Sequence, residues 1–429
     1  MKPLFCSFIA ATLAISLPAF SGPPAQVTNG NNEGVGSLRA ALSSGATHIV
    51  IKPSVQTITV TETLLYSGTK PLTVAGSGQT IDGSGLTNNL ASIFEVTNGA
   101  NLTIRKMNFD GGGGYSRSDN LNSGVEVSGG KGIFVDVPVD RTGAVEVELT
   151  HVSVYGTGNH AIHISDCTLG DECGGRGGGA GNGSPASIRV RLNNVLVAGA
   201  GFGKQNADGV RVDDRNDGDI HFSVVNSVFK NIGTDGVELD EGNNGSVYLE
   251  VRNTKFEMNG GYCLDGEFIV DDPCYDDGDP NVGDGFSVDE AGPGSIEGSL
   301  KNLQINSNFD EGLDFDEKND GGFDLRLTSI YAQGNKDQGV EISEKNDGNV
   351  RISMREVTLQ GNAVTLQGNE GSKEGIEIEE KDSGDVKVMV NGSHIDKLKI
   401  SEDGSGDGTV KVCGSTIVEP LDLDNVTEI

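Results

Sequence analysis

A repeat of about 27 residues runs through the second half of this 429-residue chain. Six related segments each contain one landmark glycine, and these glycines are Gly209, Gly236, Gly285, Gly312, Gly339 and Gly375. The steps from 209 to 236, from 285 to 312 and from 312 to 339 are each 27 residues, while the other two steps carry insertions. Self-similarity at such a period predicts stacked units that bury their apolar faces against one another. A group that recurs in every unit is a poor candidate for a catalytic residue, because a catalytic site needs it only once.

The unit that begins at Asp208 illustrates the pattern. Apolar and polar residues alternate over 210–212, a polar turn follows over 213–218, and alternation resumes over 220–224. Asn226 then marks a second turn, and apolar residues at 228–229 begin a third segment. Alternation of period two between turns rich in Gly, Asn and Asp is typical of β-strands. Each unit is therefore predicted to contain three short strands.

Three short strands per unit, with asparagine repeated at one turn (Asn194, Asn226, Asn253, Asn302), resemble the right-handed parallel β-helix of the pectin-lyase-like superfamily. The N-terminal sequences SLRAAL and LTVAGSGQTIDGSG also resemble the opening rungs of that superfamily. The resemblance implies an all-β, right-handed parallel β-helix solenoid over 22–429, as one domain, with a short capping helix at 37–42. It does not decide the activity, since this fold includes lyases, hydrolases, epimerases, adhesins and non-enzymes.

The first 21 residues have the pattern of an export signal. Lys2 precedes an apolar run and a small-residue cleavage site at 19–21, which predicts a secretory signal peptide. The apolar run is shorter than the roughly 20 residues that a membrane helix needs. We therefore expect a secreted or periplasmic protein with no membrane span in the mature chain.

The cysteines fit an oxidising compartment. Cys167 and Cys173 are close in sequence, as are Cys263 and Cys274, which predicts two local disulfides and leaves Cys413 as a free thiol. Metal binding by these thiols is the alternative. The pairs mark inserts near 167–184 and 262–283, and inserts in repeat proteins often build a binding face. The first insert is rich in glycine, so flexible decoration explains it equally well.

The formal net charge is −32. Such a polyanion repels nucleic acid and anionic lipid. The partners that we expect are divalent cations and a polysaccharide or other cell-surface component. Solubility alone could explain the charge, but it would not explain where the acids lie.

When the units are aligned, the acids fall into columns. The column five residues after each landmark glycine contains Asp214, Glu241, Glu290, Glu317, Glu344 and Glu380. The column just before it contains Asp213, Asp240, Asp289, Asp316, Ser343 and Glu379, and the column before the glycine begins with Asp208, Asp235, Asp284 and Glu311. Adjacent rungs are about 4.8 Å apart, so stacked carboxylates repel one another. Bridging cations, shared protons or interleaved bases could relieve this repulsion.

Interleaved bases are only partly present. Arg215, Lys318, Lys345 and Lys381 follow the acidic column on four rungs, whereas Gly242 and Ala291 stand there on the two middle rungs. Carboxylate-rich turns suit Ca²⁺, a hard cation with flexible geometry. We therefore predict a Ca²⁺-binding face, with a merely solvated acidic face as the alternative. The predicted ligands are Asp235, Glu238, Asp240, Glu241, Asp284, Asp289, Glu290, Asp314, Asp316 and Glu317.

An enzyme is the second interpretation. The sequence NADG at 206–209, with Asp213 and Asp214, loosely resembles the paired acids of polygalacturonase-type hydrolases, although other elements of that family are absent. His160 and His163 form the one histidine cluster, which we interpret as a solvent-facing pair on a strand. The weak catalytic candidates are His160, His163, Asp208, Asp213 and Asp214. We favour a binding or structural protein over a lyase, epimerase or hydrolase, and a non-repeated constellation beside an acidic site would favour the enzyme.

Overall fold

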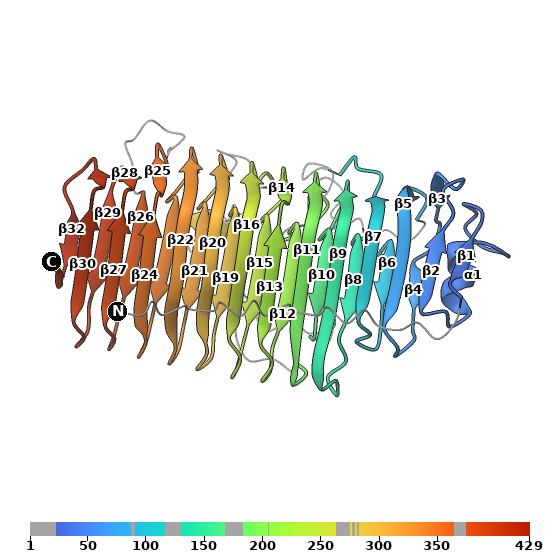
Figure 1. Cartoon of the computed structure of the whole chain (residues 1–429), viewed down its shortest axis with the longest axis horizontal. Helices are drawn as coiled ribbons and strands as arrows, with labels where there is room; N and C mark the ends of the chain where they lie inside the picture. Colours follow the sequence, from blue (N-terminus) through green and yellow to red (C-terminus); the bar gives the residue numbers. More distant parts are fainter. Residues whose placement is uncertain are drawn as a thin grey trace, which may run out of the picture.

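A computed structural model describes residues 23–86, 91–115, 130–167, 183–204, 206–262, 283–363 and 375–429, and the backbone of 275–276 and 279–280. Its strands stack side by side along one axis, from the N-terminal helix at one end to the C-terminus at the other (Figure 1). All strand pairs in the two large sheets are parallel within the described residues. Parallel strands joined by crossovers are right-handed almost without exception. The fold is thus the predicted right-handed parallel β-helix.

The first sheet has twelve strands among the described residues. They are β4 (Leu64–Tyr66), β6 (Phe94–Val96), β8 (Ile133–Asp136), β10 (Ile162–Ser165), β12 (Val210–Asp214), β15 (Val237–Glu241), β19 (Phe286–Glu290), β21 (Leu313–Glu317), β23 (Val340–Glu344), β26 (Ile376–Glu380), β29 (Leu398–Glu402) and β32 (Asp422–Asp424). Six of them (β12, β15, β19, β21, β23 and β26) are the predicted first strands of the aligned units. We call all twelve the twelve-stranded sheet.

The second and third strands of the units form a nineteen-stranded sheet within the same described ranges. Its members are β1 (Ala25–Val27), β2 (His48–Ile51), β3 (Thr57–Thr59), β5 (Leu72–Asp82), β7 (Leu102–Asp110), β9 (Gly143–Tyr155), β11 (Ala186–Ala198), β13 (Ile220–Val225), β14 (Val228–Lys230), β16 (Val247–Glu257), β20 (Ser295–Asn306), β22 (Gly322–Gln333), β24 (Asn349–Arg355), β25 (Thr358–Gln360), β27 (Val386–Asn391), β28 (His394–Ile395), β30 (Gly408–Cys413), β31 (Thr416–Ile417) and β33 (Val426–Glu428). A separate antiparallel pair, β17 (Tyr275–Asp276) and β18 (Asp279–Pro280), lies in the second insert.

The helix α1 (Leu38–Ser43) begins one residue later than predicted, because Ser37 serves as its N-cap. The Ser37 hydroxyl accepts a hydrogen bond from the Ala40 amide at 3.1 Å, as N-cap side chains do. Leu38, Ala41 and Leu42 are buried, and the helix contacts β1, β2 and β4. The helix therefore covers the first rung, whose open edge would otherwise be available to other strands.

Two series of asparagines order the turns. The predicted turn residues Asn194, Asn226, Asn253 and Asn302 all have positive φ, between 52° and 55°. Asparagine tolerates this left-handed conformation better than most residues. A second, buried series runs through Asn259, Asn308, Asn335 and Asn362, in which each side-chain amide donates to the next residue's Oδ1 at 2.9–3.0 Å.

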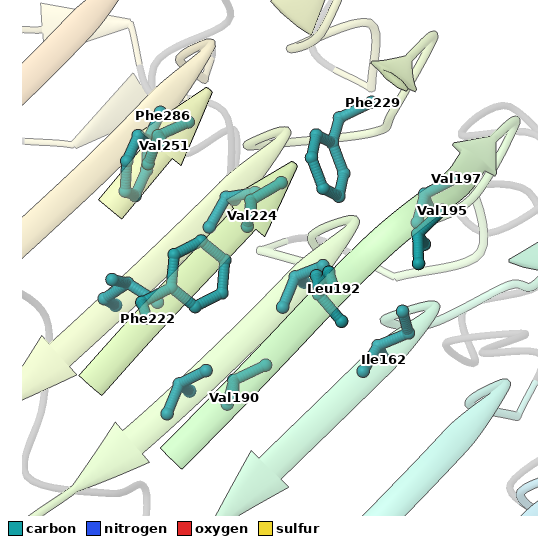
Figure 2. Packing of buried hydrophobic residues seen from close by; sticks show 14 of the residues in the cluster. Ile162, Val190, Leu192, Val195, Val197, Phe222, Val224, Phe229, Val251 and Phe286 are labelled. Atoms are coloured by element: carbon teal, nitrogen blue, oxygen red, sulfur yellow. The ribbon is translucent and has the colours of Figure 1, made fainter. Parts of the chain in front are cut away.

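The core lies between the sheets and repeats with the rungs. Val190, Phe222, Phe229 and Phe286 point into this space from three different rungs (Figure 2). The Phe229 and Phe256 rings stack with centroids 5.4 Å apart. Each rung thus buries its apolar side chains against the next, which makes the core continuous along the axis.

Several predictions concern residues outside the described ranges. The signal peptide lies there, as do Cys173, Cys263 and Cys274, so the export signal and both disulfide pairings stay predictions. Cys413 is a free, half-buried thiol. Within the described residues, no helix is long and apolar enough to cross a membrane.

Candidate functional site

The twelve-stranded sheet brings the predicted acidic columns together. In the parallel register, Asp214, Glu241, Glu290, Glu317, Glu344 and Glu380 follow one another across β12, β15, β19, β21, β23 and β26. Asp213, Asp240, Asp289 and Asp316 form the adjacent column in the same register. The 27-residue alignment is therefore correct, and the like charges do stack. The three columns relieve their repulsion in different ways.

The first column, from Asp214 to Glu380, is buried beneath the turns that follow the strands. Oε1 of Glu290 accepts a hydrogen bond from the Gly292 amide at 2.9 Å, and Glu317 accepts one from Asn319 at the same distance. Glu241 accepts from Gly245 at 3.1 Å. Each carboxyl therefore fixes the turn of its own rung. We call this column the glutamate ladder.

The glutamate ladder shares protons. Burial first, and then hydrogen bonds to Glu241 and Glu317, raise the pKa of Glu290 to about 11. Burial also raises the pKa of Glu241 to about 7 and that of Glu344 to about 8. Protonated and ionised carboxyls can then alternate along the stack, because a shared proton replaces repulsion with a hydrogen bond. Three predicted Ca²⁺ ligands, Glu241, Glu290 and Glu317, belong to this ladder.

A glycine four residues after each ladder carboxyl makes room for it. A Cβ on Gly245 would overlap the Gly218 carbonyl oxygen of the preceding rung and approach the Glu241 carboxyl. A Cβ on Gly294 would likewise overlap the Gly245 carbonyl oxygen. The acid and the glycine therefore form one structural motif, which is readable in the sequence as an acid followed by glycine at the fourth position.

The second column is neutralised by bases. Arg215 contacts Asp240 at 2.6 Å, and Lys345 contacts Asp316 at 2.7 Å. Lys318 forms an ion pair with Asp289. The two middle rungs lack their own base, as predicted, but bases on adjacent rungs supply the charge. The predicted deficit of positive charge at Asp240 and Asp289 is therefore wrong. A long basic side chain can reach across one rung spacing of about 4.8 Å.

The third column, just before the landmark glycines, is built differently. Asp208 Oδ1 accepts the Asp235 amide at 3.1 Å, and Asp284 Oδ1 accepts the Glu311 amide at 2.9 Å. Each acid therefore caps the backbone of the following rung and keeps its second oxygen for another partner.

Three groups of acids here each offer oxygens that lie within 4.8 Å of one another. They are Asp208–Asp235–Glu238, Glu238–Asp240–Asp289 and Asp284–Asp310–Glu311. Burial is the main cause that raises the pKa of Asp284 well above its usual range, and the charges of Glu311 and Asp235 add to it. The pKa of Asp310 is raised by the same two effects. These carboxylates are held close together against their mutual repulsion.

The structure places the ten predicted Ca²⁺ ligands in several different environments. Asp235, Glu238, Asp240, Asp284 and Asp289 fall in the close groups, while Asp316 is paired with lysines. Asp314 lies on β21, where burial and the charge of Asp316 raise its pKa well above the usual range. Sequence reasoning missed Asp310, whose signal is the pair of acids directly before Gly312.

A second, non-repeated constellation lies at the N-terminal side of these columns. His163 Nε2 is 2.7 Å from Asp213 Oδ2, and its Nδ1 is 2.6 Å from Lys131 Nζ. His160 Nδ1 accepts the Asp208 amide at 2.9 Å. The histidine side chains are buried, with 9% and 6% of their residue surface exposed. The prediction of a solvent-facing pair is therefore wrong. Both histidine rings contact carboxylates of the next rung, Asp208 and Asp213, and these contacts keep the rings buried.

Charge in this constellation is closely balanced. Arg211 contacts Asp213 at 2.9 Å and forms ion pairs with Glu238 and Asp240. Burial lowers the pKa of Lys131 to about 8, and burial followed by the Lys131 charge lowers that of His163 well below its usual range. A neutral His163 can accept from Lys131 and donate to Asp213. Four catalytic candidates, His160, His163, Asp208 and Asp213, meet here, whereas Asp214 belongs to the glutamate ladder.

The fold and these columns define the chain as an acidic, right-handed parallel β-helix. No protein-family model matches the sequence, and no curated protein matches it.

Solved structures with a similar fold include three proteins of different kinds. The polygalacturonase from Erwinia carotovora ssp. carotovora is 11% identical, with a TM-score of 0.43 over 97% of this chain and 99% of that one. PfbA, a surface adhesin of Streptococcus pneumoniae, is 11% identical, with a TM-score of 0.35 over 95% and 92%. ORF18 of Geobacillus virus E2 is 12% identical, with a TM-score of 0.38 over 94% of this chain, which spans 60% of the viral chain.

Proposed function

We propose that this protein is an exported binding module whose acidic face holds Ca²⁺ where its own bases do not neutralise it. The observation that carries the proposal is the group Asp284–Asp310–Glu311, whose carboxylate oxygens lie within 4.8 Å of one another. Ca²⁺ binds oxygen at about 2.3–2.6 Å, so two ligands on one ion are at most about 5 Å apart. These three side chains can therefore reach a common ion without a change in the backbone.

The electrostatics support a cation at this place. The pKa values of Asp284 and Asp310 are raised by burial and by neighbouring acids, so ionising both is costly in the protein alone. A divalent cation removes that cost, because it favours the ionised form of each ligand. The groups around Glu238 share their charge with Arg211, so we expect weaker sites there.

A bound cation would serve two purposes. It would tie adjacent rungs together, and it would leave coordination positions open to an anionic polysaccharide or another cell-surface component. A face of this charge cannot approach such a polymer directly, because like charges repel. A bound Ca²⁺ would overcome this repulsion by bridging carboxylates of the protein and of the polymer.

Thermal melting tests the cation site. A ligand that binds only the folded state raises stability by mass action, so millimolar Ca²⁺ should raise the melting temperature more than NaCl at equal ionic strength. The double variant Asp284→Asn/Asp310→Asn should lose most of this difference. Glu356→Gln removes one exposed charge from the turn between β24 and β25, and this variant should keep the difference. Identical shifts with Ca²⁺ and NaCl in the unmodified protein would exclude the proposal.

A polysaccharide-active enzyme is the second candidate, and the Lys131–His163–Asp213 chain favours it. A lysine with its pKa lowered to about 8 is a suitable base for removing the proton next to a uronate carboxylate. A uronate-polymer screen with and without Ca²⁺ tests this function. An active protein that loses its activity in Lys131→Ala, but not in the ladder variant Glu344→Gln, would support the enzyme. Inactivity on all uronate polymers would leave only the binding module.

A further inference from the structure

The nineteen-stranded sheet carries a hollow of about 440 Å³, on a different sheet from the acidic columns. It extends over β11, β13, β16, β20 and β22, which are paired in this order. Its volume lies within the range of small-molecule sites, about 300–1,000 Å³. The outward side chains of its lining include Arg189, His221, Tyr248, Glu250, Glu297 and Asp324.

One row of outward side chains crosses the hollow along the solenoid axis. In the parallel register, Arg189, His221, Tyr248, Glu297 and Asp324 follow one another across the five strands. Successive members of the row are one rung apart, about 4.8 Å. The row therefore changes along the axis from a base, through two rings, to two acids.

The two rings of this row stack on each other. The centroids of His221 and Tyr248 are 4.8 Å apart, and the ring planes differ by 15°. Because His221 covers one face of the Tyr248 ring, the other face looks toward Glu297. Tyr248 is 37% exposed, and it is the one aromatic residue among the exposed large hydrophobic side chains in the described part of the chain. The stack thus presents one open aromatic face, on its acidic side.

The charge around this open face is negative. On β16, β20 and β22 the lining contains three acids, Glu250, Glu297 and Asp324, and one base, Arg326. Asp324 lies 3.9 Å from Arg326, and Glu250 forms an ion pair with Arg252. Glu297 is exposed and has no ion-pair partner among the described residues. It therefore leaves an uncompensated negative charge next to the Tyr248 ring.

The ring behind Tyr248 does not oppose a cation. Burial is the largest cause that lowers the pKa of His221, and the charge of Arg189 lowers it further. His221 is therefore mostly neutral at pH 7, because its ordinary pKa is already about 6.5. The stack presents its aromatic face without adding positive charge.

Short side chains leave room in front of the ring. Ser299 stands opposite Glu250 in the register and lies two residues after Glu297, on the same face of β20. The Glu297 carboxylate can lie to one side, over Ser299. Asp324, the next member of the row, is also short. A ligand can therefore reach the face of Tyr248 from the solvent.

We propose that this hollow binds a small quaternary ammonium ion of the choline type, with its methyl groups on the open face of Tyr248 and its charge beside Glu297. The face of an aromatic ring attracts such a cation, and a nearby carboxylate adds to the attraction. The net charge of −32 also draws cations toward the protein. This site goes beyond the proposed Ca²⁺ function, because it lies on the other sheet and needs no metal.

Saturation-transfer NMR with the full chain in EDTA tests the proposal. The probes are choline, its uncharged analogue dimethylbutanol, in which carbon replaces the nitrogen, and acetyl-lysine amide, which carries a primary ammonium. Choline should bind saturably, and its methyl protons should receive the strongest saturation from the protein. Dimethylbutanol should bind much more weakly because it has no charge, and NaCl should weaken choline binding by screening.

Four variants locate the binding. Tyr248→Ala should weaken choline binding roughly fivefold, whereas Tyr248→Phe should keep it, because the ring face remains. Glu297→Gln should weaken it roughly threefold. Glu428→Gln removes the same charge from β33 of the same sheet, outside the hollow, and should leave the affinity unchanged.

Several results would overturn the proposal. Absence of saturable choline binding would do so, and equal binding of dimethylbutanol would show apolar adsorption instead. Equal binding of acetyl-lysine amide would show simple ion pairing without recognition of the methyl groups. Equal losses in Glu297→Gln and Glu428→Gln would show attraction by the net charge alone. The Asp284→Asn/Asp310→Asn variant should bind choline normally, so failure of the Ca²⁺ site and failure of this site give different results.

Discussion

At the scale of single residues, Glu290 shows why the acidic columns do not all bind cations. Its carboxyl lies between those of Glu241 and Glu317, and burial holds its pKa near 11. A carboxyl in this position is neutral at pH 7 and donates its proton to a neighbour. It therefore behaves as a hydrogen-bonding group. The stack resembles a row of side-chain amides that hydrogen-bond to one another more than it resembles a row of charges.

Replacement of Glu290 tests this interpretation. Glu290→Gln keeps a donor and an acceptor, so it should change the melting temperature little at pH 5 and raise it at pH 8. Glu290→Ala loses the hydrogen bond to Gly292 and leaves its partners unsatisfied, which should destabilise the protein by about 1–3 kcal/mol at both pH values. Thermal melting of the two variants at the two pH values measures the effect. Equal destabilisation by Gln and Ala would contradict proton sharing.

At the scale of elements, the turn after each strand of the twelve-stranded sheet is a repeated unit. A ladder carboxyl accepts hydrogen bonds from the turn, and the glycine four residues later lets the next rung approach. The helix α1 closes the first rung with its buried Leu38 and Leu42. The repeated turns set the spacing of the rungs, and the helix ends the stack.

Gly245→Ala should therefore be costly. The new methyl group would overlap the carbonyl oxygen of Gly218 and approach the Glu241 carboxyl, so the turn must shift. We expect a loss of about 1–3 kcal/mol, the usual effect of overpacking. Gly261→Ala is the matched control, because its methyl group would meet the Phe202 ring at 3.3 Å and the Ile232 carbonyl oxygen at 3.7 Å without overlapping either. Denaturant unfolding of both variants measures their free energies of unfolding. Similar losses of stability would mean that the glycines after the ladder carboxyls do not set the spacing of the rungs.

At the scale of the whole molecule, the two sheets divide the charge. The twelve-stranded sheet stacks acids from β12 to β26, while the nineteen-stranded sheet carries arginines beside acids around Tyr248. The proposed Ca²⁺ site therefore lies on the side of the twelve-stranded sheet, where the acids gather.

The stacked carboxyls make the stability of the whole molecule depend on pH. Asp214, Glu241, Glu344 and Glu380 have folded pKa values raised to about 9, 7, 8 and 8. A raised pKa means that the folded state binds the proton more tightly, so this stability is complete below the unfolded pKa near 4.5 and is lost as the pH rises through about 7–9. In EDTA, we expect a higher melting temperature at pH 5 than at pH 8.5. A melting temperature that rises over this range would contradict the pKa directions.

The period could be found by aligning the repeats, and the period then predicts the register. A repeat of 27 residues places Asp214, Glu241 and Glu290 at one position of successive rungs, so the columns follow from alignment alone. The αL turn at Asn226 and the helix after Ser37 were also readable, because local backbone preference decides them.

Only the tertiary structure decided how each column is neutralised. Arg215 reaches Asp240 on the next rung, and Lys131 reaches His163 across 32 residues, which a period of 27 does not specify. Burial beneath a turn separates Glu290 from Asp289, although the two are neighbours in sequence. A hollow over β11, β13, β16 and β20 was likewise invisible, because Arg191, Tyr248 and Gly298 line it together only when four rungs are stacked. The physical reason is that a repeat fixes which residues are adjacent, whereas the reach and burial of their side chains fix what they do.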